Sequence, residues 1–271
     1  MNLEPASVLN RNPASEEHLR EPWNIPDIHI QAGAYALRFA RTRSDLRAAQ
    51  RLRFEVFNLE LGEGLMASYS TGADEDQFDE CCHHMLVEHR ETGSIVGTYR
   101  LMTRAMARDG FYSESEFRLG ALPPWIMVEG VELGRACVAS QHRTGRVIYL
   151  LWTGISEYLV WSRKRYLFGC CSVPGTDPGV GLQLHLQLAE QGRLVEGYSA
   201  CPTALFSCEG ASLSDTSVKI PPLFQVYLDM GAKVCSGPAL DREFRVIDFL
   251  VVLDIENMDP KAYARFFKDR R

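Results

Sequence analysis

The sequence predicts an α+β fold, with a central, mostly antiparallel mixed sheet flanked by helices. First, strand-like segments alternate large apolar with small or polar side chains, and residues 84–89 and 95–101 form a hairpin around a Glu-Thr-Gly-Ser turn. Second, segments with apolar residues at helical spacing separate other strands. Third, the elements run strand, helix, loop, three strands, helix, strand, two helices and strand, without an internal repeat, which favours one sheet with helical layers.

Bulk properties narrow the class of protein. A chain of 271 residues, 46% of them hydrophobic, can bury a large core as one domain or one and a half. The net charge of -6 and the pI near 5.7 argue against a nucleic-acid binder. We find no secretory signal and no apolar run long enough to span a membrane. The eight cysteines are therefore expected to be reduced thiols in a reducing cytoplasm.

The first elements follow from local patterns. Residues 1–30 are rich in Pro, Asn, Glu and Ser without an apolar period, which predicts a flexible N-terminal lead-in. Alternation over 35–39 predicts the first strand. A helix capped by Ser44-Asp45 is expected to run to about Phe57. The acidic stretch 58–80 predicts a long loop, and loops of this length are more often functional than idle.

The later elements follow an irregular segment, 104–126. They are a central strand over 128–138, a long helix after Gly145, a strand over 166–171, a helix from Pro178, a helix from Pro221-Pro222 to Met230 and a strand over 244–253. Residues 31–257 thus form the main domain, and 258–271 form an amphipathic, basic C-terminal helix. Residues 260–271 could lie on an anionic membrane surface or pack on the domain, and both alternatives stay open.

The central strand carries Glu132 and Arg135. Because side chains alternate along a strand, the two point to opposite faces unless a β-bulge breaks the alternation. A carboxylate in the middle of a strand is costly to bury unless it is paired or used in function. A structural ion pair and a functional site are the two interpretations. Elsewhere, Cys81-Cys82-His83-His84 lacks the spacing that lets ligands converge, so we predict no metal site.

Four motifs in this order resemble the landmarks of autoinducer (acyl-homoserine lactone) synthases, which have the GNAT acyltransferase fold. They are Leu52-Arg53-Phe54-Glu55-Val56-Phe57, Asp76-Gln77-Phe78-Asp79, Ile95-Val96-Gly97-Thr98-Tyr99-Arg100-Leu101 and Glu132-Leu133-Gly134-Arg135. The chain is still more similar to the hemolysin-like ornithine-lipid N-acyltransferases (lyso-ornithine lipid synthases). That group shares Glu-Leu-Gly-Arg-x-Cys-Val followed by Arg143, the run from Pro221 to Ala232 and Asp248-Phe249-Leu250. The resemblance covers about residues 33–255.

The resemblance implies an N-acyltransferase. It would move a (3-hydroxy)fatty acyl group from the thioester of acyl carrier protein to the α-amine of ornithine, forming lyso-ornithine lipid. Glu132 is the candidate general base, through water, and Arg135 is expected to hold the acceptor carboxylate or to orient Glu132. The substrate wall is expected to contain Arg53, Phe57, Asp76, Phe78, Asp79 and Arg100, with the carboxylates holding the amines of ornithine. Residues expected to bind the acyl donor are Cys137, Val138, Ala139, Arg143, Gly145 and Arg146.

The expected donor follows from a departure from the pattern of acetyl-CoA users. In residues 141–146 one glycine is displaced and Arg146 replaces a small residue, which crowds the approach of two phosphates. Acyl carrier protein presents one phosphate, on its 4'-phosphopantetheine arm, and an acidic surface. Arg143, Arg146 and the basic cluster 163–165 would suit it. No cofactor is expected beyond this co-substrate.

Several alternatives stay open. The chain could be an autoinducer synthase that uses S-adenosylmethionine, another N-acyl amino acid synthase, or a non-catalytic hemolysin-like binding protein. Its length and the run 221–232 count against autoinducer synthesis. A covalent route through Cys137 is disfavoured because no His-Cys pairing is visible. Lysine, glutamine, glycine and tyrosine remain chemically open as acceptors. The lipid product suggests a cytoplasmic enzyme, peripheral on the inner face of the membrane.

Overall fold

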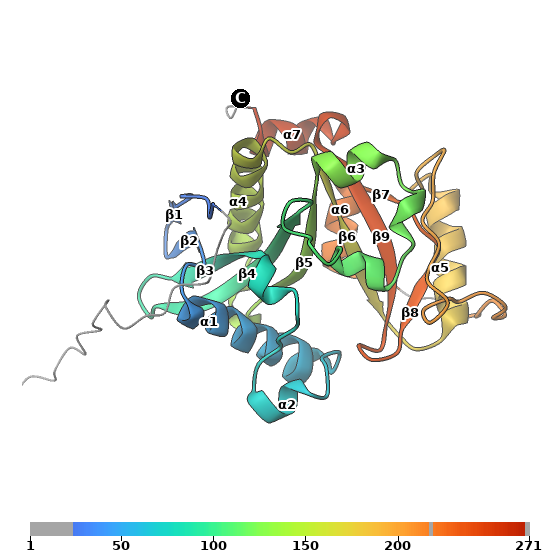
Figure 1. Ribbon diagram of the computed structural model, residues 1–271, viewed down its shortest axis with the longest axis horizontal. Helices are drawn as coiled ribbons and strands as arrows, with labels where there is room; N and C mark the ends of the chain where they lie inside the picture. Colours follow the sequence, from blue (N-terminus) through green and yellow to red (C-terminus); the bar gives the residue numbers. More distant parts are fainter. Residues whose placement is uncertain (1–23, 217–218, 269–271) are drawn as a thin grey trace, which may run out of the picture.

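A computed structural model describes residues 24–216 and 219–268, in which nine strands form one sheet (Figure 1). The strands are β1 (Ile30–Ala32), β2 (Tyr35–Phe39), β3 (His83–His89), β4 (Ser94–Thr103), β5 (Gly130–Val138), β6 (Tyr166–Pro174), β7 (Lys233–Val234), β8 (Ala239–Asp241) and β9 (Val246–Asp254). Their order is β1-β2-β3-β4-β5-β6-β9-β7, and β8 pairs with β9. Residues 1–23 of the expected lead-in and 269–271 of the expected C-terminal helix lie outside the described residues.

The pairing of β5 with β6 is the one parallel pairing among the described strands, and it is short. It joins Gly130–Glu132 to Tyr166–Phe168, and beyond that point the two strands part. β5 stays with β4 as far as Val138, while β6 pairs with β9 along its whole length. The sheet is therefore open between the C-terminal halves of β5 and β6, which was not predicted, and it is mixed and mostly antiparallel, as predicted.

Helices cover both faces of the sheet. They are α1 (Arg43–Phe54), α2 (Ser68–Thr71), α3 (Pro124–Glu129), α4 (Arg146–Ser162), α5 (Pro178–Glu190), α6 (Pro222–Asp229) and α7 (Pro260–Phe266). Apolar residues of α4, α5, α6 and α7 share one core cluster, on what we call the α4 face. The opposite face, the α1 face, is covered by α1, by α3 and by the irregular segment 104–126. In Figure 1, α3 lies in front of the sheet and α6 lies behind it.

Helix α4 forms as its apolar spacing predicts. Val147, Leu151 and Ile155 are fully buried against the sheet, so they anchor β2 to β5 from one side. Gly145 begins the helix in a left-handed conformation, with φ 82°. Such a conformation is open to glycine at little cost. The end of β5 is thereby connected to the helix through a tight turn.

Helix α1 is capped two residues before the predicted Ser44. Its cap is Thr42, whose hydroxyl accepts a hydrogen bond from the Asp45 amide, and the Asp45 carboxylate accepts one from the Thr42 amide. The helix does not stop near Phe57 but continues as a π-helix, Glu55–Leu61. π-helical turns often occur at functional sites. The predicted loop 58–80 therefore starts inside a helix and also contains α2.

Other expectations needed correction. The strand Ile30–Ala32, which pairs with β2, was not predicted. The central strand starts at Gly130 rather than 128, since Pro124 opens α3. The short strands β7 and β8 were not predicted, because neither carries a run long enough to show alternation.

The C-terminal helix packs on the domain. Phe266 and Phe267 are buried, and the Phe266 ring lies 5.9 Å from that of Trp152 in α4. The aromatic side of this helix thus packs on the protein itself, while Lys261 and Arg265 are exposed. Among the described residues, none of the helices has both the length and the apolar character needed to cross a membrane.

Gly169 sits where β5 and β6 part, and it offers a test of this arrangement. A Cβ atom at this position would lie 2.2 Å from the Leu133 carbonyl oxygen. We expect Gly169→Ala to push the strands apart and to lower the free energy of unfolding by about 1–3 kcal/mol, the usual cost of overpacking. Denaturant titration measures this loss. Gly134→Ala is the matched control, because its Cβ meets nothing within 4 Å. Equal stabilities of the two variants would contradict the close approach.

Candidate active site

A cavity of about 250 Å³ occupies the gap between β5 and β6. Tyr99 and Arg100 are neighbours on β4, and both line it. Neighbouring residues on a strand point to opposite faces, so the cavity passes through the sheet from one face to the other. The lining residues are Phe57, Glu63, Tyr99, Arg100, Tyr112, Leu133, Gly134, Arg135, Ala136, Cys170, Cys171, Ser172, Pro221, Leu223, Phe224, Tyr227, Phe244, Val246 and Asp248.

The part of the cavity on the α4 face is apolar. A second, smaller cavity of about 40 Å³ shares Tyr99, Leu133 and Tyr227 with the first and extends toward Trp152 and Leu253. The Tyr99 and Tyr227 hydroxyls hydrogen-bond to each other at 2.6 Å, and burial raises the pKa of both. The two phenols therefore stay neutral. This side of the sheet offers an apolar path for an acyl chain.

A β-bulge brings Arg135 to the α1 face, where Glu132 also lies. Thr98 pairs with Cys137 and Arg100 with Gly134, so Tyr99 alone faces two residues of β5. Arg135 takes a left-handed conformation with φ 52°. For a residue with a side chain this conformation costs of order 1 kcal/mol, and such outliers cluster at functional sites. The sequence left open whether Glu132 and Arg135 point to opposite faces or whether a β-bulge brings them to one face, and the structure has the bulge.

A charge network of three arginines and three aspartates lies beside the cavity. Arg53, which is fully buried, binds Asp79 at 2.7 and 2.9 Å and Asp74 at 3.2 Å. Arg100 binds Asp76 at 2.7 Å and Asp79 at 3.0 Å. Burial alone would raise the pKa of Asp79, but the Arg53 guanidinium holds it far below its ordinary value. The Asp79 carboxylate is therefore charged and paired.

Arg135 is the loosest member of the charge network. Its contacts to Asp74 and Asp76 are long, 3.5 and 3.4 Å, and its Nε makes no hydrogen bond within the described residues. The guanidinium lies instead between the rings of Tyr112 and Phe244, at 5.2 and 4.5 Å from their centroids. Arg135 thus has donors left for a ligand, and its side chain is held in place by stacking.

Glu132 is placed differently from the expectation for a base. It does not line the cavity, and its carboxylate accepts hydrogen bonds from the Tyr112 amide at 2.9 Å, the Ser113 amide at 2.7 Å and the Ser113 hydroxyl at 2.5 Å. Burial raises its pKa against these hydrogen bonds. The geometry gives Glu132 a positioning role: it fixes the 3-10 turn Tyr112–Ser115, which carries Tyr112 into the cavity wall. It does not pair with Arg135.

Of the residues expected in the substrate wall, the structure brings only Phe57 and Arg100 to the cavity, next to Arg135. Phe57, Arg100 and Arg135 line the cavity, but Arg53, Asp76 and Asp79 lie behind it as members of the charge network. Asp76 and Asp79 are already neutralised by arginines, so they are poorly suited to hold the amines of an acceptor. Phe78 packs against the guanidinium of Arg100, 5.7 Å from its ring centroid, rather than facing the cavity.

The residues expected to bind the donor lie along the end of β5 and the start of α4. Cys137 is buried against Leu52 and Val56, and burial raises its pKa to about 12, which excludes a ready thiolate nucleophile. Val138 and Ala139 end the strand, half-buried, with backbone hydrogen bonds toward β4.

The basic residues of the predicted donor site do not form one surface. Arg143 forms a two-pronged ion pair with Glu60, and Arg146 is exposed in the first turn of α4, next to Gly145. Residues 163–165 follow the other end of α4, whose 17 residues span about 25 Å. Arg165 is moreover paired with Asp254 at 2.7 Å. The cluster 163–165 therefore lies at the opposite end of α4 from Arg143 and Arg146 and cannot share one phosphate with them.

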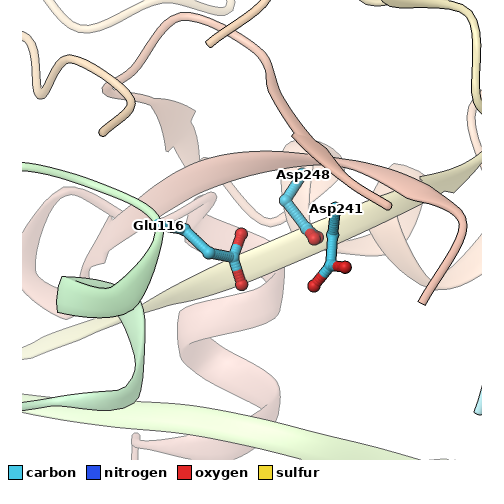
Figure 2. A group of neighbouring side chains, drawn as sticks. All are labelled: Glu116, Asp241 and Asp248. Carbon is cyan, nitrogen blue, oxygen red and sulfur yellow. The ribbon is translucent and has the colours of Figure 1, made fainter. Parts of the chain in front are cut away.

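A second group of charged residues was not predicted. Glu116, Asp241 and Asp248, which we call the acidic triad, are buried, and their carboxylate oxygens lie within 4.8 Å of one another. Figure 2 shows the carboxylate of Glu116, from the segment before α3, pointing toward those of Asp241 and Asp248. Asp248 also lines the cavity. The triad combines residues from three separate parts of the chain.

The three carboxylates differ in their partners. Asp248 accepts a hydrogen bond from the Ser172 hydroxyl at 2.6 Å, and Asp241 accepts two from the amides of Glu243 and Phe244. Neither carboxylate oxygen of Glu116 has a hydrogen-bond partner among the described residues. Burial, and then the charge of Asp248, raises the pKa of Glu116 well above its ordinary value. Burial raises the pKa of Asp248 to about 6, against the hydrogen bond from Ser172.

One signal in the sequence pointed to the triad. Asp248 interrupts an otherwise apolar strand, and a lone carboxylate in such a strand is costly unless it is used. Glu116 and Asp241 gave no comparable signal, because they sit in irregular segments where a charged residue is ordinary.

The fold and the cavity in the opened sheet define an acyltransferase of the GNAT class, and residues 52–153 match the acetyltransferase (GNAT) domain family. The chain is 34% identical to the L-ornithine N(alpha)-acyltransferase of Agrobacterium fabrum, with 83% of each chain covered. It is also 34% identical to the protein of that name from Rhizobium meliloti, over 94% of this chain and 92% of the relative. The chain belongs to the L-ornithine N(alpha)-acyltransferase family. Among solved structures, an N-acyl amino acid synthase from uncultured soil microbes superposes with a TM-score of 0.48 at 11% identity, over 86% of this chain and 96% of that one.

The raised pKa of Asp248 predicts a pH dependence of stability. Between the ordinary pKa of 3.8 and the folded-state value of about 6, the folded protein holds a proton that the unfolded chain has lost. This contribution to stability is present at low pH and is lost as the pH rises through about 6. We expect the free energy of unfolding of the wild type, relative to Asp248→Asn, to fall by roughly 2–3 kcal/mol between about pH 4 and pH 7.

The measurement is urea denaturation of both proteins across this pH range. Using the difference between the two curves removes the acid destabilisation caused by the paired carboxylates of the charge network, which has the opposite sign. A difference that does not change with pH would show that Asp248 titrates normally.

Proposed function

We propose that this chain transfers a 3-hydroxy fatty acyl group from acyl carrier protein to the α-amine of ornithine, releasing lyso-ornithine lipid. The observation that carries the proposal is the cavity through the sheet, which is polar on the α1 face and apolar on the α4 face. An amino acid and a fatty chain can enter from opposite sides and meet between β5 and β6. The name of the curated relatives supports ornithine as the acceptor.

The parted strands supply the donor site. Beyond Glu132, β5 has no strand partner on its β6 side, so backbone groups there are free to bind the pantetheine arm and the thioester oxygen. The amine nitrogen attacks the thioester carbon, the C–N bond forms, and the C–S bond breaks. The proton that the amine loses is taken up by the departing sulfur. Because the cavity holds the thioester and the amine in line, the main remaining requirement for the reaction is that the amine be neutral.

Two guanidinium groups, those of Arg100 and Arg135, line the polar half of the cavity. Arg100 is paired with Asp76 and Asp79, whereas Arg135 has only long contacts to its aspartates. The positive charge of Arg135 lowers the pKa of a nearby ammonium group and so favours the neutral, nucleophilic α-amine. Arg135, with its unused donors, also binds the α-carboxylate of the acceptor in our proposal. This places the α-amine next to the opening between the strands without requiring Glu132 to act as the base.

The donor is proposed to be acyl carrier protein rather than coenzyme A. Arg146 is exposed in the first turn of α4, next to the end of β5, where its charge can meet a single phosphate and the acidic surface of the carrier. The product carries a fatty chain, and each CH₂ group favours a bilayer by about 0.8 kcal/mol. We therefore propose that the enzyme works in the cytoplasm and delivers product at the inner face of the membrane, with the exposed residues Lys261 and Arg265 of α7 as the contact.

The direct test uses the purified full chain with 3-hydroxyacyl carrier protein and ornithine, and mass spectrometry of the extracted lipid. We expect N-acylornithine to form with the carrier-bound donor and at least about tenfold more slowly with the same acyl group on coenzyme A. Transfer to S-adenosylmethionine in place of ornithine would favour the autoinducer alternative. Absence of transfer to any amino acid would overturn the proposal and favour a binding protein.

Two arginine variants should separate acceptor from donor binding. Arg135→Lys loses the planar donor pair, and a hydrogen bond between charged groups is worth about 1.5–3 kcal/mol, so we expect the KM for ornithine to rise at least about tenfold. Arg146→Glu should instead raise the KM for the carrier-bound donor and leave that for ornithine unchanged. Steady-state kinetics with each substrate varied in turn measures both effects. If Arg135→Lys changed only the donor KM, the acceptor assignment would be wrong.

A further inference from the structure

The acidic triad differs physically from the charge network beside it. In the network, three arginines balance three aspartates, so the buried charges are paired. No Lys or Arg among the described residues forms an ion pair with Glu116, Asp241 or Asp248. Burying an unpaired carboxylate is expensive, and a fold gains nothing structural from gathering three of them. The cluster therefore points to a cation that the folded chain itself does not supply.

Within the triad, Glu116 is the residue whose carboxylate has no hydrogen-bond partner among the described residues. Its side chain is 1% exposed, both of its carboxylate oxygens lack hydrogen-bond partners within the described residues, and it points toward the two aspartates (Figure 2). A purely structural carboxylate would be expected to accept hydrogen bonds, as Glu132 does three times. Glu116 is thus poised to accept hydrogen bonds from a group that enters the cluster.

The triad also has access to the reaction cavity. Asp248 lines the cavity together with Arg135, and the charge of Arg135 acts on Asp248. The polar half of the cavity therefore has two poles of opposite sign: the guanidinium of Arg135, with free donors, and the carboxylate of Asp248, whose triad partners Glu116 and Asp241 lie within 4.8 Å without lining the cavity themselves. An amino acid whose side chain carries an ammonium group has the complementary pattern, with a carboxylate at one end and a cation at the other.

We propose that the acidic triad binds the side-chain ammonium group of the acceptor and keeps it protonated, so that only the α-amine is acylated; this inference rests on the proposed function. An ammonium group has three N–H donors, and the triad offers one carboxylate for each. Negative charge stabilises the ammonium form of the side-chain amine, which makes that amine non-nucleophilic. The positive charge of the loosely paired Arg135 acts on the α-amine in the opposite sense.

The acyl transfer proposed above yields the α-N-acylated product without any additional catalytic group. The C–N bond forms at the α-nitrogen, the C–S bond of the thioester breaks, and one proton passes from the α-nitrogen to sulfur. The side-chain nitrogen keeps its three protons throughout. A divalent cation coordinated by the triad is the rival occupant, because carboxylate oxygens are also the ligands that Mg²⁺ and Ca²⁺ prefer.

The test compares ornithine with norvaline, which has the same carbon chain without the side-chain amine. For the wild type we expect kcat/KM to be on the order of 100-fold higher for ornithine, since a site built for a polar group rejects the analogue that lacks it. In Glu116→Gln and Asp241→Asn this ratio should fall at least about tenfold, and ornithine acylated on its side-chain nitrogen should appear in the product, as resolved by tandem mass spectrometry. Glu190→Gln, on the exposed end of α5, is the matched control with an unchanged ratio.

Calorimetric titration of ornithine into the same proteins without acyl donor gives a second readout, and thermal unfolding shows that each variant is folded. Weaker ornithine binding in Glu116→Gln but not in Glu190→Gln is expected. An unchanged ornithine-to-norvaline ratio in both triad variants would overturn the inference while leaving the proposed function intact. Retention of a divalent metal by the wild type, lost in Glu116→Gln together with activity, would overturn it in favour of a metal site. A wild type that acylates no amino acid would instead overturn the proposed function.

Discussion

The arrangement of this molecule depends on the way β5 and β6 part after three paired residues. Each strand is held by a different neighbour: β5 by β4 and β6 by β9. The right-handed twist of the sheet then separates strands that no longer share hydrogen bonds. Leu133 and Gly169 remain in close contact at the parting point, so the gap opens at a fixed place. A cavity that connects the two faces of a sheet is unusual, because a regular sheet closes such a path with its own backbone hydrogen bonds.

Two groups of buried charged residues border this cavity: the charge network, in which arginines and aspartates are paired, and the acidic triad, which has no paired cation within the part of the chain that the structure describes. The charge network is neutral and holds Arg53 and Arg100 between aspartates, so it fixes the wall of the cavity. Buried ion pairs of this kind often contribute little net stability, but they hold side chains in one geometry. The acidic triad has no such balance, and burial raises the pKa of Glu116 and of Asp248, because ionised carboxylates are costly to hold there. Natural proteins keep such costly groups mainly where function requires them.

The sequence predicted those parts of the fold that have a regular period. The hairpin of β3 and β4, the helix α4 and the strand β9 all follow from alternation or helical spacing, and the resemblance in motifs led to the right family. What it could not predict depends on tertiary contacts. The bulge at Arg135 needs the register of β4, and the role of Glu132 depends on the turn at Tyr112, which is distant in sequence. Glu116 meets Asp248 only because segment 104–126 covers the α1 face.

The chemistry of the reaction explains why the two substrates should reach each other through a sheet rather than across a single surface cleft. A fatty acyl chain favours an apolar path, whereas an amino acid with two amines and a carboxylate favours fixed charges, and one lining cannot serve both. Tyr99 and Arg100 show how the fold resolves this conflict. Because consecutive residues of one strand face opposite sides, β4 contributes a neutral phenol to the apolar half and a guanidinium to the polar half of the same cavity. The separation of polar from apolar chemistry is thus built into the alternation of β4, and in our proposal the reacting atoms meet beside the bulge of β5.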